Sequence, residues 1–524
     1  MAQQREQWGS KIGVILAVAG SAIGLGNFLR FPVKAASFGG GAFLIPYFVA
    51  FLLLGIPLAW MEWTLGRYGG RYSHGSAPGI LNAVVRKPWA KYLGSLGIIG
   101  PLLINFYYIY IESWLLGFAW YALTGDLMEA VSANAVGPFF ENYILLKTTL
   151  LHGTVPAALA FFLATFFLNL LVVYGGIRRG IERISVLVMP IILVLGLILL
   201  ARVLTLPNIT QGLAFMWNPD FSALAKPRVW LEASGQIFFT LSIGIGAVLT
   251  YASYVKRKQD VALSSLSANA ANEFAEVILG GTIVVPMAVV VFGAANIETI
   301  AKMGTFGLGF QTMPMIFGKM PLPQFFQFIW FALLFFAGVT SSISLLQPPI
   351  AFFEDELGMK RRSSILVTGA VLLAMGLLAV YGLGAGAVDE MDFWGGTVAL
   401  VVFGTVEAIL FSWVFGIERG WKELNEGSQI RIPRFFKFVL QWVTPTYLVI
   451  ILVTWFITDF RSVILLEGVD RAAQVPFLGM MVNKVHFITG LRLVLVGLLL
   501  AINAVIFFAW RKRKLDDKLL HPLD

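Results

Sequence analysis

GSAIGLGN at residues 20–27 and SIGIG at residues 242–246 are glycine-rich stretches inside two long apolar segments of this chain. A glycine inside a helix costs about 1 kcal/mol relative to alanine, so such stretches weaken a helix where they occur. Close packing of helices over small residues is one explanation of each stretch. Their occurrence in the first and sixth apolar segments favours another, a pair of broken transmembrane helices whose freed carbonyl oxygens bind cations. We therefore expect a binding site where these two helices unwind.

The composition is that of a membrane protein. Of the 524 residues, 58% are hydrophobic and only 13% are charged, whereas about 25% of the residues in a typical soluble domain are charged. Apolar runs such as 186–206 and 436–458 have the ~20 residues that a helix needs to cross a bilayer. We expect an all-α polytopic membrane protein with twelve transmembrane helices. The expected spans are 11–36, 41–70, 88–124, 157–175, 183–205, 230–254, 262–293, 324–357, 363–383, 389–417, 437–460 and 485–510.

Basic clusters lie before the first span or after even-numbered spans. They are Arg5 and Lys11; Arg67, Arg71, Arg86, Lys87 and Lys91; Arg178, Arg179 and Arg183; Lys256, Arg257 and Lys258; Lys360, Arg361 and Arg362; Arg431, Arg434 and Lys437; and Arg511, Lys512, Arg513 and Lys514. The positive-inside rule then predicts that the N-terminal segment 1–10 and the C-terminal tail 511–524 are both cytoplasmic. Topology therefore explains the net charge of +9 better than a nucleic-acid partner does.

Several classes of chemistry are disfavoured. The chain has no cysteine, and its four histidines are scattered, so we expect neither disulfides nor a His or Cys metal cluster. Charged residues inside spans are costly and are functional candidates by default. The embedded carboxylates are Glu62, Glu112, Glu276 and Glu407. Because no His or Cys nucleophile accompanies them, an intramembrane enzyme is disfavoured. For Glu62 and Glu112 a structural hydrogen-bonding role is as well supported as a functional one.

Oxygen-bearing side chains suited to a hard cation flank both breaks. They are Asn27, Asn272, Thr240, Ser242, Thr340 and Ser341. Ala337, Thr340 and Ser341 share one face of the eighth span, because they are three and four residues apart. Any single hydroxyl could instead bond to its own helix backbone. Two amides and two hydroxyl clusters beside two unwound helices together favour sodium over a proton as the coupling ion.

Charged and aromatic residues at the two ends of this region are candidate gates. Arg30 follows the first break and Asp392 opens the tenth span. Both are expected near the outer side, where they could pair across an access path. Arg5, Asp355 and Tyr254 are expected on the cytoplasmic side, where they could close the opposite end.

Six longer segments resemble the signature segments of the neurotransmitter:sodium symporter family. They are GSAIGLGNFLRFP, GGGAFLIPY, YYIYIESW, GQIFFTLSIGIG, FFAGVTSSISLLQP and DEMDFWGG. The similarity covers nearly the whole chain and is greatest to the family's bacterial leucine transporter. It implies the leucine-transporter (LeuT) fold, with inverted five-helix repeats at 11–205 and 230–417 followed by two helices at 437–510. It also implies a sodium-coupled amino-acid symporter of the prokaryotic inner (plasma) membrane.

The resemblance further implies two sodium ions and an amino-acid site between them. The first sodium site would use Ala22, Asn27, Thr240, Asn272 and the substrate carboxylate. The second would use Gly20, Ile23, Ala337, Thr340 and Ser341. The substrate-binding residues would be Ser21, Ala22, Gly24, Leu25, Gly26, Ile104, Tyr108, Phe239, Thr240, Ser242, Ile245, Ser341 and Leu345. The outer gate would use Arg30, Asp392, Tyr108 and Phe239, and the inner gate Arg5, Asp355, Ser253 and Tyr254, with Trp8 beside it. Since the substrate carboxylate completes a sodium site, ion and amino acid would bind interdependently.

This sequence departs from the leucine transporter at four pocket positions. Ser21 replaces an asparagine, Ile104 a valine, Ile245 a phenylalanine and Leu345 an isoleucine. We expect a reshaped, roomier and still apolar pocket. Leucine, methionine, isoleucine and aromatic amino acids remain candidates, because one methylene changes selectivity by only ~1–3 kcal/mol.

Glu276 predicts independence from chloride. In chloride-dependent relatives a small hydroxyl residue stands at this position, and chloride supplies the negative charge. A carboxylate near Tyr47, Gln236, Thr240 and Asn272 would supply it directly. The sequence leaves open whether Glu276 also exchanges a proton. Two other functions on the same fold, an amino-acid sensor and a ligand-gated channel, are also left open. A homodimer through the last two spans is a further possibility.

Overall fold

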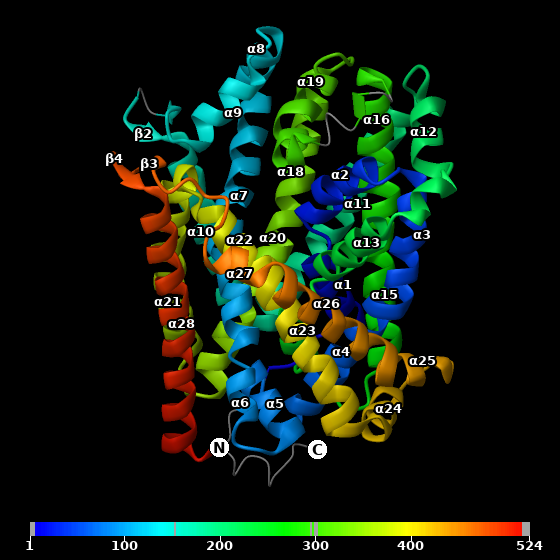
Figure 1. Ribbon diagram of the computed structural model, residues 1–524, viewed down its shortest axis with the longest axis vertical. Coiled ribbons are helices and arrows are strands. Elements are labelled where there is room, and N and C mark those ends of the chain that lie inside the picture. Colours follow the sequence, from blue (N-terminus) through cyan, green and yellow to red (C-terminus); the bar gives the residue numbers. More distant parts are fainter. Residues whose placement is uncertain (1–5, 151–152, 294–295, 298–301, 516–524) are drawn as a thin grey trace.

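The computed structural model describes residues 6–150, 153–293, 296–297 and 302–515, which fold mainly into helices (Figure 1). The helices of the first half are α1 (Lys11–Ala22), α2 (Phe31–Ser37), α3 (Gly41–Ala50), α4 (Ile56–Gly70), α5 (Ala77–Val85), α6 (Ala90–Leu93), α7 (Leu96–Thr124), α8 (Asp126–Ser132), α9 (Val136–Ile144), α10 (Ala157–Tyr174) and α11 (Arg183–Leu204). Next come α12 (Ile209–Trp217), α13 (Pro227–Thr240), α14 (Ala247–Ala252), α15 (Val261–Glu273), α16 (Thr282–Phe292), α18 (Gly304–Gly307), α19 (Met313–Phe317), α20 (Pro323–Asp355), α21 (Arg361–Gly382), α22 (Ala387–Asp392), α23 (Leu400–Ile409) and α24 (Ile417–Asn425). The last are α25 (Phe435–Phe438), α26 (Thr444–Thr458), α27 (Phe460–Ile464) and α28 (Lys484–Arg513). Two antiparallel hairpins pair β1 (Thr149–Leu150) with β2 (Val155–Pro156) and β3 (Gln474–Phe477) with β4 (Met480–Asn483).

Ten helical segments of the described chain are long and apolar enough to cross a membrane. They are Gly41–Gly70, Ala90–Thr124, Ala157–Tyr174, Ile177–Leu204, Val261–Phe292, Pro323–Asp355, Arg361–Ala385, Ala387–Asn425, Phe435–Thr458 and Lys484–Arg513. The bent pair Lys11–Ala22 and Gly26–Ser37, which meets at 47°, adds an eleventh. The sixth expected span is divided into α13 and α14, of 14 and 6 residues, and neither piece is long enough to span a bilayer alone. The prediction of an all-α polytopic membrane protein is confirmed, and the sixth span differs from an ordinary helix because it is interrupted.

The centre of the molecule is formed by α7 and α20, whose most apolar stretches are almost entirely buried. α26 and α28 lie at the periphery, and most of their residues are at least partly exposed. Small residues let neighbouring helices approach α20 closely. At Gly338 an added Cβ would lie 3.0 Å from Glu112 of α7, so a larger residue would push these two helices apart.

Several helices contain a π-helical turn, and most of these turns lie within the candidate spans. Two of these turns carry predicted site residues: Gly26–Arg30 contains Asn27, and Phe274–Gly281 contains Glu276. The others are Phe51–Gly55, Ile177–Glu182, Leu308–Thr312, Phe393–Ala399, Leu410–Gly416 and Val439–Val443. A π-helical turn changes which side chains of a helix face a neighbour, and such turns occur frequently at functional sites.

Candidate functional site

The first break begins where α1 ends at Ala22. Ile23 is extended, with φ −74° and ψ 98°, and its N–H donates to the Ala19 carbonyl at 2.7 Å. Because α1 stops here, no following helical turn donates N–H groups to its last carbonyl oxygens. Helical structure resumes at Gly26, and the Asn27 side-chain oxygen accepts from the Gly24 N–H at 2.8 Å. Asn27 thus holds the start of the second half-helix in place.

The second break separates α13 from α14 and needs glycine for steric reasons. Gly244 and Gly246 have φ of 72° and 89°, in the left-handed region that glycine adopts without strain. A Cβ at Gly244 would lie 2.5 Å from the Leu400 carbonyl oxygen, and one at Gly246 would lie 2.6 Å from that of Gly97. The Ser242 hydroxyl donates to the Ser21 carbonyl at 2.9 Å, so the two breaks are in direct contact.

Gly244→Ala is expected to destabilise the protein and to abolish ligand binding. The new Cβ would clash with the Leu400 carbonyl oxygen, and alanine would be strained at the positive φ of this position. Thermal unfolding of the purified protein should show a lowered Tm. Gly235→Ala is the matched control, since it lies on α13 where an added Cβ meets nothing within 4 Å. Equal Tm values for the two variants would contradict the close packing of the second break.

A buried cluster of amide, hydroxyl and carboxylate oxygens lies beside both breaks. Asn27 Nδ2 donates to Asn272 Oδ1 at 2.8 Å and to Glu276 Oε2 at 3.0 Å. Asn272 Nδ2 donates to Thr240 Oγ1 at 3.1 Å, and the Thr240 hydroxyl donates to Glu276. Gln236 Nε2 donates to the other Glu276 oxygen at 2.7 Å. Three predicted ligands of the first sodium site, Asn27, Thr240 and Asn272, are therefore together, and this set offers the oxygen ligands that a hard cation prefers.

A second group of oxygens lies between the end of α1 and one face of α20. Ser341 Oγ donates to the Gly20 and Ala337 carbonyls at 3.4 and 3.1 Å. The Thr340 hydroxyl donates to Ala337 at 3.1 Å. A Cβ at Gly20 would lie 3.0 Å from the Cβ of Thr340, so only a very small residue permits this approach. The residues predicted for the second sodium site on α1 and α20 are thus adjacent in the structure.

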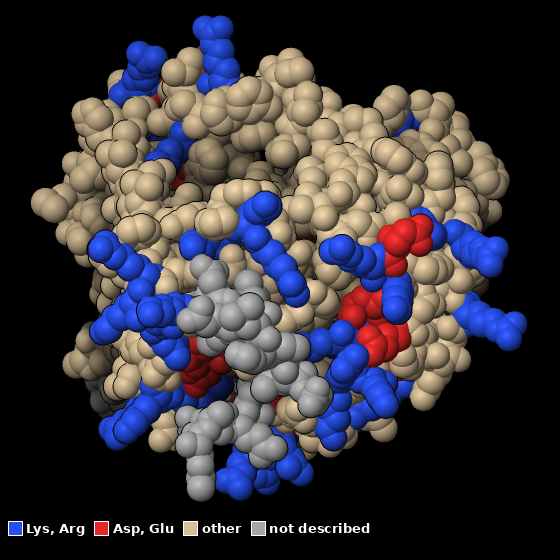
Figure 2. Space-filling model, turned by 90° about the horizontal axis from the view of Figure 1, so that it is seen from below, with Lys and Arg blue, Asp and Glu red and all other residues tan. Residues whose placement is uncertain are grey.

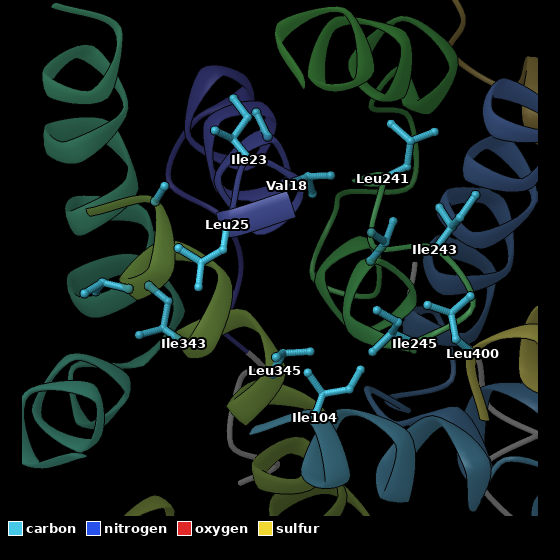
Figure 3. Close-up of a cluster of buried hydrophobic side chains, with 14 of the residues drawn as sticks. Val18, Ile23, Leu25, Ile104, Leu241, Ile243, Ile245, Ile343, Leu345 and Leu400 are labelled. Carbon is cyan, nitrogen blue, oxygen red and sulfur yellow. The ribbon is translucent and has the colours of Figure 1, made fainter. Parts of the chain in front are cut away.

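A cavity of about 50 Å³ lies between these two groups. It is lined by Ser21, Ala22, Gly24, Leu25, Gly26, Ile104, Tyr108, Phe239, Thr240, Ser242, Ile245, Ser341, Leu345 and Leu400. All thirteen predicted substrate-binding residues contribute to it, and Leu400 is an addition from α23. Figure 3 shows Ile104, Ile245 and Leu345 close together, with Leu400 beside Ile245. The Tyr108 hydroxyl accepts weakly from the Leu25 N–H, at 3.5 Å.

A sequence model of the sodium:neurotransmitter symporter family matches residues 5–136 and 127–496. The chain belongs to this family. An uncharacterized sodium-dependent transporter of Methanocaldococcus jannaschii is 30% identical over 448 residues, which are 85% of this chain and 89% of that protein. The sodium- and chloride-dependent taurine transporter of Rattus norvegicus is 27% identical to this chain. The match covers 84% of this chain and 76% of the taurine transporter.

Among solved structures, the crystal structure of MhsT in complex with L-phenylalanine superposes with a TM-score of 0.74. It is 30% identical in sequence, and the match covers 86% of this chain and 99% of MhsT. This neighbour has the LeuT fold, so the fold expected from the resemblance is confirmed. The protein is a sodium-dependent symporter, and its relatives are transporters rather than enzymes.

Beside the symporter's cavity, Arg30 stacks on the ring of the lining residue Phe239. Its guanidinium carbon lies 4.1 Å from the Phe239 ring centroid. Asp392 accepts from the Tyr107 hydroxyl at 2.5 Å. Within the described chain no ion pair of 4.0 Å or less joins Arg30 to Asp392. Arg30 and Asp392 therefore have different partners, and Tyr107, to which sequence reasoning gave no role, holds the carboxylate.

Trp8 lies against α14, the helix that follows the second break. Its indole N–H donates to the Tyr251 carbonyl at 2.9 Å, and its ring packs edge-on against that of Tyr251. The Tyr254 hydroxyl accepts from Gln347 Nε2 at 3.0 Å, and Gln347 Oε1 accepts from Arg361 at 3.2 Å. Sequence reasoning missed Gln347 and Arg361, because only packing brings α20 and α21 to this segment.

Of the remaining residues predicted for the inner gate, the structure describes Ser253 and Asp355. Arg5 lies outside the described residues, so its predicted position stays a prediction. The Ser253 hydroxyl donates to the Thr250 carbonyl of its own helix at 2.6 Å. The backbone carbonyl of Asp355 accepts from Arg513 at 3.1 Å, which links the end of α20 to the end of α28.

Two embedded carboxylates fix helices around the site. Glu62 of α4 accepts from the N–H of Gly244 in the second break. Glu112 of α7 accepts from Asn169 of α10 at 3.1 Å, and Asn169 in turn accepts from the Ser342 hydroxyl at 2.6 Å. These hydrogen bonds support the structural role that the sequence analysis left open for Glu62 and Glu112.

Proposed function

We propose that this symporter couples the sodium gradient to uptake of a neutral, apolar amino acid, aliphatic or aromatic, by alternating access and without chloride. The observation that carries the proposal is the cavity between the two breaks. Its lining contains no charged side chain, and one wall consists of Ile104, Ile245, Leu345 and Leu400. A charged substrate side chain would lose its hydration there without a partner, whereas an apolar one would bury its surface favourably.

Two sodium ions are assigned to the oxygen groups beside the cavity. The first would be held by Asn27, Asn272, Thr240 and the Ala22 carbonyl, with the carboxylate of the amino acid as a further ligand. The second would be held by the carbonyls of Gly20, Ile23 and Ala337 and the hydroxyls of Thr340 and Ser341. The substrate's carboxylate would also face the N–H groups at the start of the Gly26–Arg30 turn, where a half-helix is positively polarised. Shared ligands make the binding of ion and substrate reciprocal.

Gating is assigned to the two ends of the cavity. Arg30 with Phe239, and Asp392 with Tyr107, would close the outer end, while Trp8, Tyr254 and Asp355 would close the inner one. The basic clusters support an orientation with both termini in the cytoplasm of a prokaryotic cell, because Lys and Arg are abundant on the lower face of the molecule in Figure 2. Arg5 would complete the inner gate.

The proposal is tested by equilibrium binding of a panel of labelled amino acids to the purified protein, in sodium and in potassium. Saturable binding of an apolar amino acid in sodium only is the expected result. Equal binding in both salts would contradict sodium coupling and would favour proton coupling or a sensor. MhsT was crystallised with L-phenylalanine, which makes phenylalanine and leucine the first two probes.

Leu400→Ala is expected to shift selectivity towards aromatic amino acids. Removing this side chain enlarges the cavity beside Ile245, which should raise the affinity for phenylalanine relative to leucine by about 10-fold. Competition binding with the two amino acids measures this ratio. Val401→Ala is the control, because Val401 is the next residue of α23 and does not line the cavity. An unchanged ratio in Leu400→Ala would remove Leu400 from the specificity pocket.

A further inference from the structure

A second, polar cavity lies at the opposite end of the molecule from the outer gate, between α4, α5 and α24. Its volume is about 560 Å³. Its charged lining residues are Arg71, Arg86, Arg257, Arg419, Lys422, Glu423 and Glu426. Five of these are basic and two are acidic, so the cavity has an excess of positive charge. The end of the molecule on which it lies is the one where Lys and Arg side chains gather in Figure 2.

The two acidic residues are already occupied by arginines. Arg71 donates to Glu423 at 2.6 Å and to Glu426 at 2.8 Å, and Arg257 donates to Glu426 at 3.2 Å. Arg67, buried beneath them, donates to Glu423 at 3.1 Å. Partial burial raises the pKa of Glu426, but the hydrogen bonds and charges of Arg71 and Arg257 more than offset this and hold that pKa below its usual value. Both carboxylates therefore serve to position arginines and cannot neutralise the rest of the cavity.

Three basic groups remain available to a ligand. Arg419 and Lys422 are exposed, lie three residues apart on one face of α24, and make no ion pair or side-chain hydrogen bond within the described residues. Arg86 is also exposed and donates to the Tyr72 hydroxyl at 3.0 Å. These side chains come from two separate elements and line one cavity, which is an arrangement suited to a multivalent anion.

The cavity also borders exposed apolar side chains. Val414 lines it and is 46% exposed, and the neighbouring Trp413 is 44% exposed. α24 itself is amphipathic: Ile417 and Leu424 are buried, whereas Arg419 is exposed. Arg419 and Lys422 of this helix line the same cavity as the exposed Val414. A ligand here would meet basic groups and exposed apolar groups together.

We propose that this cavity binds the phosphate of an anionic phospholipid, with an acyl chain against Val414 and Trp413. Guanidinium groups pair with phosphate through two parallel hydrogen bonds, and a lysine adds a point charge. Inorganic phosphate shares the headgroup chemistry but lacks the acyl chain. Lipid binding at this site requires neither sodium nor an amino acid, so the proposal goes beyond the proposed function. It also does not depend on which side of the membrane this end of the molecule faces.

The test compares phosphatidylglycerol with phosphatidylcholine by native mass spectrometry of the purified protein, counting bound lipids over a titration. The double variant Arg419→Gln/Lys422→Gln should lose about 10-fold or more in affinity for phosphatidylglycerol, because each basic residue contributes measurably to binding anionic lipid. Lys360→Gln/Arg362→Gln removes the same charge from the start of α21, outside the cavity, and should leave the affinity unchanged. Sodium-dependent amino-acid binding, measured on the same samples, should be intact in the double variant and reports correct folding.

Three results would overturn the proposal. An equal loss in both double variants would indicate general attraction to a basic surface. Equal affinities for the two lipids would indicate an apolar groove that does not recognise phosphate. Binding of inorganic phosphate at constant ionic strength, with no advantage for phosphatidylglycerol, would assign the site to a free anion. None of these results bears on sodium-dependent amino-acid binding, so failure of this proposal and failure of the proposed function can be told apart.

Discussion

Asn272→Ala is expected to weaken sodium binding and substrate binding together, by about 10- to 100-fold each. Asn272 is buried and hydrogen-bonded to Asn27 and Thr240 beside both breaks. Removing its amide takes one oxygen from the proposed first sodium site, and a hydrogen bond or ligand contact to a charged group contributes about 1.5–3 kcal/mol. Because the substrate carboxylate would share that ion, the loss must appear in both affinities. Titration of amino-acid binding at several sodium concentrations measures the two together.

Asn105→Ala is the matched control for this prediction. Asn105 is an equally buried amide, and its Nδ2 donates to the Ser342 carbonyl at 3.2 Å, away from the oxygen cluster. Its loss should lower Tm without changing the sodium dependence of substrate binding. If Asn272→Ala weakened substrate binding while the sodium dependence stayed that of the unmodified protein, the shared site would be ruled out.

Glu276→Ser should turn a chloride-independent symporter into a chloride-dependent one. Glu276 accepts hydrogen bonds from Asn27, Gln236 and Thr240, so its carboxylate lies within the cluster proposed to hold sodium. Replacing it with a hydroxyl removes a negative charge beside a cation in a region with little screening by water. In gluconate medium, sodium-dependent binding should fall by at least about 10-fold, and added chloride should restore it. Uptake into proteoliposomes in the two media gives the same comparison for transport.

Glu112→Gln separates this effect from the general cost of altering a buried carboxylate. Glu112 is fully buried and bonded to Asn169, outside the oxygen cluster. This variant should bind and transport equally in gluconate and in chloride. A chloride requirement in the unmodified protein, or no rescue of Glu276→Ser by chloride, would contradict the proposed role of Glu276.

The spans were predictable because hydrophobic length and glycine placement are local properties. The expected span 41–70 coincides with Gly41–Gly70, and 324–357 differs by two residues at most from Pro323–Asp355. Both interrupted helices were also visible as glycine-rich stretches. The sequence did not show the π-helical turns, because a π-helical turn depends on how the two halves of a helix pack rather than on a residue pattern.

The oxygen-bearing residues of the site were predictable for a related reason. Sodium needs oxygen ligands, and few Asn, Thr and Ser residues adjoin the two breaks, so Asn27 and Thr240 stood out by chemistry and position. Asn272 lies in the seventh span and stood out by its chemistry. Leu400 carried no such signal. Leucine is common throughout the spans, and only the packing of α23 against the second break brings Leu400 into the cavity.

By itself, then, the sequence determined that the chain crosses a membrane many times, that its first and sixth spans are interrupted, and which oxygen-bearing residues lie beside the interruptions. Only the tertiary structure decided that Arg30 stacks on Phe239 while Asp392 bonds to Tyr107, and that Arg419 and Lys422 share a cavity with Arg86. Hydrophobicity and helical periodicity act over a few turns of one segment, so they can be read along the chain. Contacts between segments hundreds of residues apart depend on how whole helices pack, and no local pattern encodes them.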